Sequence, residues 1–132
     1  MSRHPVLLFL APLVAVTMSV AAQESEDEQA RRLLADGRAY RAQGKLKQAL
    51  DNFDIVVSSF PATDSVGQAL LEIGRYRMEV EGDAEKARAA FEQVTKQYAR
   101  SDAAPGAYHN LGLLTLQRAT TPAETDEFVR AH

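Results

Sequence analysis

The 132-residue chain contains no cysteine and no tryptophan, and only three of its residues, His4, His109 and His132, are histidines. The lack of cysteine excludes a disulfide framework, a thiolate metal site, a cysteine nucleophile and a lipid attached through cysteine. Positive charge is also scarce, because 15 Lys+Arg stand against 18 Asp+Glu and give a formal net charge of -3. Nucleic-acid-binding surfaces are usually basic, so no nucleic-acid partner is predicted. The composition therefore predicts neither a metal nor another cofactor.

Catalytic motifs are missing as well. The sequence contains no HExxH, GxSxG, GxGxxG, Walker A or EF-hand pattern. His109 stands beside Tyr108 and Asn110 and is predicted to be a polar surface or groove residue rather than a catalytic base. The chain is therefore predicted not to be an enzyme, to have no catalytic residues and to take no small-molecule substrate. A small enzyme whose site carries no known motif is the least favoured alternative.

Residues 1–22 have the pattern of a cleaved secretory signal peptide. Arg3 precedes an uncharged apolar run from Val6 to Val20, and small residues at Ala21 and Ala22 stand before Gln23. The run is shorter than the roughly 20 apolar residues of a spanning helix, although an uncleaved membrane anchor is an alternative. No cysteine follows, so the protein is predicted to be exported, periplasmic or secreted, and not a lipoprotein.

An acidic N-terminal segment, residues 23–28, separates this signal from the rest of the chain. It contains Glu24, Glu26, Asp27 and Glu28. Negative charge at the start of a helix complements the helix dipole, and that role is favoured over a cation site.

Small and aromatic residues recur along the remaining sequence at spacings of 37 or 38 residues, which indicates internal repeats. The recurring positions are Gly37, Gly74 and Gly112, then Gly44 and Gly82, Ala49 and Ala87, and Phe53 and Phe91. Since Gly37, Gly74 and Gly112 fall inside helical patterns, where glycine costs about 1 kcal/mol relative to alanine, we expect a close helix contact there. Alanine is expected opposite each glycine, with phenylalanine between neighbouring hairpins.

Apolar periodicity and turn residues predict paired helices. Helices are expected at 26–43 and 46–59, from 65, from 84 and near 105, and a sixth is expected from 121. Ser25 and Glu28 are spaced as a capping box, Asp64 and Asp83 are predicted N-caps, and Gly44 ends the first helix.

These positions resemble the tetratricopeptide (TPR) repeat family. The residues that match its pattern are Gly37, Tyr40, Gly44, Ala49, Phe53, Pro61, Gly74, Gly82, Ala87, Phe91 and Gly112. Arg77, Ala99 and Thr115 depart from it. The resemblance implies an all-α, antiparallel helix-hairpin solenoid of about two and a half repeats in a domain at 29–132, with units at 29–63, 64–101 and 102–132, the last incomplete.

The long repeat and the segments 58–61 and 97–101 look like the connections in TPR proteins of the Gram-negative envelope. Those proteins include outer-membrane assembly proteins of the BamD type and the Tol–Pal-associated division coordinator.

In the TPR family the first helix of each unit lines a concave groove. The positions that the resemblance assigns to a partner-binding groove are Arg31, Leu34, Arg38, Arg41, Gln68, Leu71, Arg75, Met78, His109, Leu113 and Leu116. Arginine beside aliphatic surface suits a peptide that carries carboxylates. Leu34 and Arg38 stand where chaperone-binding clamps carry other residues, so chaperone tails are not predicted as partners.

The function expected from the sequence is a non-catalytic, exported scaffold that binds other envelope proteins or peptides. The alternative is an adaptor subunit of an envelope enzyme complex for peptidoglycan synthesis, hydrolysis or division. Because the helix from 121 is short, the chain is expected to be the N-terminal part of a longer protein, or a short adaptor completed by a partner or a second copy. Self-association through the open C-terminal end is therefore possible in this interpretation.

Overall fold

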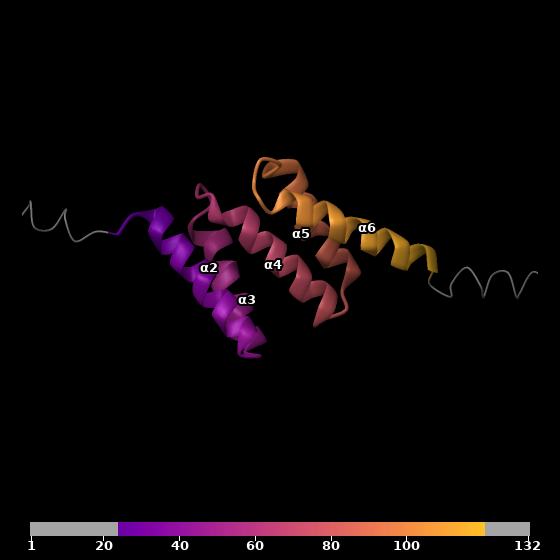
Figure 1. Ribbon diagram of the computed structural model, residues 1–132, viewed down its shortest axis with the longest axis horizontal. Coiled ribbons are helices and arrows are strands. Elements are labelled where there is room, and N and C mark those ends of the chain that lie inside the picture. Colours follow the sequence, from indigo (N-terminus) through magenta and orange to yellow (C-terminus); the bar gives the residue numbers. More distant parts are fainter. Residues whose placement is uncertain (1–23, 121–132) are drawn as a thin grey trace, which may run out of the picture.

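The computed structural model describes residues 24–120, and these residues form five helices and no strand (Figure 1). The helices are α2 (Glu26–Ala42), α3 (Leu46–Ser59), α4 (Ser65–Glu79), α5 (Ala84–Gln97) and α6 (Ala104–Thr120). They confirm the five helices expected before residue 121. The predicted signal peptide at 1–22 and the predicted sixth helix lie outside the described residues. No helix in the described part of the chain is long and apolar enough to cross a membrane.

The helices pack in the order in which they occur. α2 pairs with α3 and α4 pairs with α5 as antiparallel hairpins, while α3 packs on α4 and α5 packs on α6 (Figure 1). This arrangement confirms the predicted all-α, helix-hairpin solenoid. It places the first helices of successive units, α2, α4 and α6, next to one another along one side.

The capping box at the start of α2 forms as predicted. The backbone N–H of Glu28 donates to the hydroxyl of Ser25, the N–H of Ser25 donates to the carboxylate of Glu28, and both distances are 3.2 Å. Glu26, Asp27 and Glu28 consequently lie in the first turn of α2. The first repeat helix thus begins at Glu26, three residues before the predicted domain boundary, because the acidic residues stabilise the helix start.

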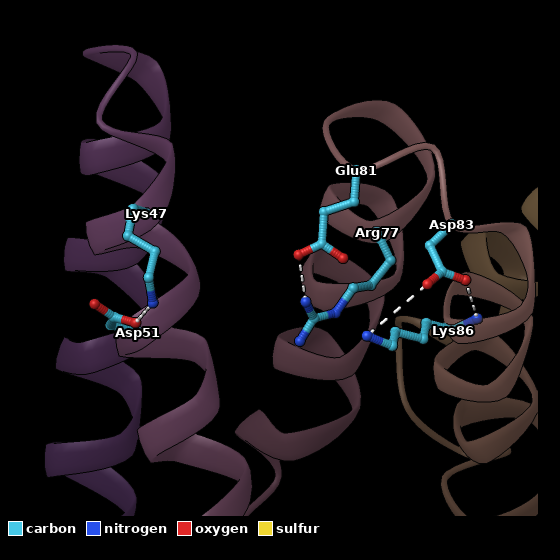
Figure 2. Close-up of polar contacts among 6 residues, drawn as sticks. All are labelled: Lys47, Asp51, Arg77, Glu81, Asp83 and Lys86. Atoms are coloured by element: carbon cyan, nitrogen blue, oxygen red, sulfur yellow. Dashed lines mark hydrogen bonds and ion pairs between the residues drawn. The ribbon is translucent and has the colours of Figure 1, made fainter.

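Two further N-caps were predicted, and only one of them forms. Asp83 accepts a hydrogen bond from the backbone N–H of Lys86 at 3.0 Å, and the ammonium of Lys86 lies 3.9 Å from the same carboxylate (Figure 2). Asp64 precedes α4 with helical backbone angles, and its side chain makes no cap hydrogen bond. The turn before α4 is held instead by the hydroxyl of Thr63, which donates to the carbonyl of Phe60 at 2.8 Å.

Glycines with left-handed backbone angles connect the two helices of each hairpin. φ is +78° at Gly44 and +64° at Gly82, and no other non-neighbouring atom lies within 4 Å of a Cβ built at either position. The turns therefore require glycine because it adopts left-handed backbone angles easily, and not because a side chain would clash with neighbouring atoms.

Replacement of Gly82 by alanine tests this point. We expect the variant to lose about 1–2 kcal/mol of unfolding free energy, because an L-residue is strained in the left-handed region. Asparagine at the same position should cost less, since it tolerates that region better. Urea denaturation would measure both variants, and equal stability of Gly82→Ala and the parent would contradict the assignment.

Each hairpin is closed by a phenylalanine packed on a glycine. A Cβ built at Gly37 would lie 2.5 Å from the ring of Phe53, and one at Gly74 would lie 2.4 Å from the ring of Phe91. The close approach predicted at these glycines is confirmed. The partner is different, because phenylalanine rather than alanine covers the glycine, and it does so within its own hairpin.

Gly112 does not repeat this packing among the described residues, since nothing lies within 4 Å of a Cβ built there. The helix that was predicted to pack on it begins at 121, outside the described range. The core itself runs through all five helices, from Ala30 in α2 to Leu114 in α6.

Candidate functional site

The packing of the helices defines an inner and an outer side. α4 lies against both α2 and α6. In contrast, no Cα atom of α3 lies within 8 Å of a Cα atom of α5. Helices that approach one another lie on the shorter, inner side of a curved stack, and helices that stay apart lie on the outer side. The inner side is called the concave face below.

The predicted groove residues divide into two groups. Exposed or half-buried positions are Arg31, Arg38, Arg41, Gln68, Arg75, Met78, His109, Leu113 and Leu116. Leu34 and Leu71 are each only 7% exposed and belong to the core, which corrects their assignment as exposed groove residues. Leu71 is buried because α6 packs over it. A Cβ built at Gly106 of α6 would lie 3.1 Å from the Leu71 side chain.

An ion network joins the two repeats on the concave face. The guanidinium of Arg38 donates to the Glu72 carboxylate at 3.2 Å and to the Gln68 side-chain oxygen at 2.5 Å. Arg41 donates to the second carboxylate oxygen of Glu72. The Glu72 side chain is 3% exposed, while Arg38 and Arg41 are 42% and 45% exposed. Two cations therefore share one buried carboxylate, and a positive charge remains in excess.

Sequence analysis missed Glu72, although a signal was present. Arg38 and Arg41 are three residues apart, and Gln68 and Glu72 are four apart, so each pair occupies one helix face. The two pairs lie about one repeat apart. Donors and acceptors at that offset could have indicated a pairing between the first helices of consecutive units.

A cleft of about 830 Å³ opens beside this network, where α2 faces the two connectors between hairpins. The first connector is residues 60–64 and the second is residues 98–103. We call this cavity the connector cleft. Arg31 and Arg38 of α2 and Arg100 of the second connector line it, and the mostly buried Leu34 contributes a small part of the lining.

The connectors that form the cleft have the same local structure. In the first, the N–H of Thr63 donates to the carbonyl of Phe60 at 3.2 Å, and in the second, the N–H of Ser101 donates to the carbonyl of Tyr98 at 2.9 Å. The second connector rests on the start of α4, because a Cβ built at Gly67 would lie 2.4 Å from the Ser101 hydroxyl. The cleft walls are therefore held by packed, hydrogen-bonded turns.

The far end of the concave face has a different character. On α6, Tyr108 is 60% exposed, Leu116 is 65% exposed and Leu113 is 39% exposed. His109 is also exposed. The face thus changes from arginine-rich at α2 to apolar at α6.

Some charged groups away from the concave face form local pairs. Lys47 lies 2.5 Å from Asp51, and this hydrogen bond raises the pKa of Lys47 (Figure 2). Burial raises the pKa of the nearby Asp54 carboxyl, and the charge of Arg77 opposes that rise. Arg77 itself pairs with Glu81 at 2.5 Å (Figure 2). These interactions stabilise helices and leave the concave face as the candidate site.

Residues 24–120 contain no cluster of three or more histidine, cysteine, aspartate or glutamate side chains that could hold a metal ion.

Comparison with known families agrees with the fold. Residues 37–63 and 68–101 match the family model of the tetratricopeptide repeat, which supports a TPR protein. Such repeats generally mediate protein–protein interaction and are typically non-catalytic modules. No curated protein and no solved structure matches the chain.

Proposed function

We propose that this protein is an exported, non-catalytic scaffold of the bacterial cell envelope that binds a partner protein through its concave face. The observation that carries the proposal is the concave face itself, where exposed arginines of α2 and the half-buried Arg75 of α4 continue into exposed leucines of α6. A surface that combines exposed guanidinium groups and apolar side chains suits a protein or peptide ligand.

Export and the envelope are part of the same proposal. Residues 1–22 combine a positive start, an apolar run and small residues before Gln23, as a signal peptide does. The extended repeat length and the Phe60-Pro61 connection support an envelope protein of the BamD or division-coordinator type.

Charge reversal on the concave face tests the proposal. We expect Arg31→Glu combined with Arg75→Glu to abolish capture of the partner from an envelope extract, because the new carboxylates repel an acidic ligand. Neither arginine has an ion pair within residues 24–120, so the fold should be retained, as circular dichroism would show. Arg38 is unsuitable for this purpose, since a glutamate there would face buried Glu72.

The matched control is Lys47→Glu combined with Lys86→Glu, which makes the same change in charge on the outer helices α3 and α5. The control should capture the same protein as the parent. Capture that survives in the Arg31/Arg75 variant, or is lost equally in the control, would move the interaction away from the concave face.

A further inference from the structure

Four basic side chains line the connector cleft, and two of them already have a carboxylate partner. Arg38 pairs with Glu72, and Lys96 pairs with Glu92. Arg31 and Arg100 differ, because neither side chain makes a hydrogen bond or ion pair with any residue from 24 to 120. Two exposed guanidinium groups that line one cleft without partners are suited to an external anion.

The two arginines reach the cleft from different elements. Arg31 projects from the second turn of α2, and Arg100 belongs to the second connector. A third cation, Arg38, lines the same wall as Arg31, and Glu72 and Gln68 hold its guanidinium in place. The positive side of the cleft is therefore partly preorganised before any ligand arrives.

We propose that the connector cleft binds an extended peptide segment of the partner protein through one acidic side chain, which sits between Arg31 and Arg100. This inference rests on the proposed function and gives it a defined site and ligand chemistry. Planar guanidinium groups bind carboxylates through paired hydrogen bonds, and both arginines line the cleft.

The length of the cleft matches a short, extended peptide segment. The α2 wall runs from Asp27 to Arg38, which at 1.5 Å per residue is about 16 Å. An extended peptide of about five residues spans that distance. The proposal assigns the acidic group to a glutamate or aspartate side chain within such a segment.

Acidic residues of the cleft restrict the ligand further. Asp27, Asp64 and Asp102 also line it, and none of them forms an ion pair within the described residues. They would repel a segment with many negative charges. The fitting ligand therefore has a single carboxylate flanked by neutral or basic residues.

Selection from a random dodecapeptide library with the purified protein tests the proposal. Recovered peptides should share one acidic position with neutral or basic neighbours. The tightest peptide and its Glu→Gln or Asp→Asn version would then be titrated by fluorescence anisotropy against the parent, Arg31→Gln, Arg100→Gln and the control Lys47→Gln. We expect about tenfold or greater loss of affinity for each arginine variant and for the amide peptide, as for a charged hydrogen bond.

The coupling between protein and peptide decides the outcome. If Arg31 and Arg100 bind the carboxylate, the amide peptide should bind the parent and the arginine variants with nearly the same affinity. The proposal would be overturned if the losses of affinity from the arginine substitution and from the amide peptide were independent and additive. It would also be overturned if the recovered peptides shared no acidic position, or if Arg100→Gln left the affinity unchanged. If one of these results were found while the Arg31/Arg75 variant still lost partner capture, the cleft proposal would be wrong. The proposed binding function of the concave face would be retained.

Discussion

Gly74→Leu is expected to destabilise the protein by about 3 kcal/mol, the upper part of the range for overpacked cores. A Cβ alone would lie 2.4 Å from the ring of Phe91, and Phe91 is fully buried, so the ring has no space to move into. The gain in helix propensity on removing a glycine, about 1 kcal/mol, cannot offset this clash. Urea denaturation followed by circular dichroism would measure the change.

Gly112→Leu is the matched control, because this glycine has the same place in the repeat and nothing within 4 Å of its Cβ position among residues 24–120. We expect its unfolding free energy to stay within about 1 kcal/mol of the parent. An unchanged midpoint for Gly74→Leu would show that Phe91 can leave the glycine at little cost.

Replacing both Arg38 and Arg41 with methionine should cost about 2 kcal/mol. The substitutions keep the aliphatic stems and helix propensity but leave the Glu72 carboxylate, 3% exposed, without a cation. The expected loss is below that of a fully buried pair because both arginines are partly exposed to water.

Addition of Glu72→Met to that double variant should restore most of the lost stability, since no buried charge then remains. Thermal or urea unfolding of the parent, the double variant, Glu72→Met alone and the triple variant measures the coupling. A double variant as stable as the parent would mean that the carboxylate needs neither arginine.

The local features of the fold could be predicted because they depend on residues close in sequence. The capping box of Ser25 and Glu28, the turn at Gly44 and the repeat spacing each followed from short-range patterns. The predicted Asp64 cap failed for a local reason, whereas the groove assignment of Leu71 failed because of a neighbouring helix. Leu71 matches a groove position in the repeat pattern, yet α6 covers it, and that packing is set by the tertiary structure.

The candidate site was predictable in outline but not in its electrostatics. The resemblance to TPR repeats assigned the first helix of each unit to the concave face, and α2, α4 and α6 do lie next to one another. It could not show that Arg38 and Arg41 are bound to Glu72, or that the side chains of Arg31 and Arg100 have no polar partner among residues 24–120. Charge pairing between repeats depends on the angle between helices, which a single sequence does not give.

The packing of each helix mainly on its predecessor has a consequence for how the chain folds. α2 packs on α3 and α4 and does not reach α5 or α6, so residues that touch one another stay close in sequence. Low contact order favours rapid folding, and quasi-one-dimensional stacks can begin folding at any unit and spread from there. On the proposed export route, one hairpin emerging from the channel could thus become ordered before the next hairpin has followed it.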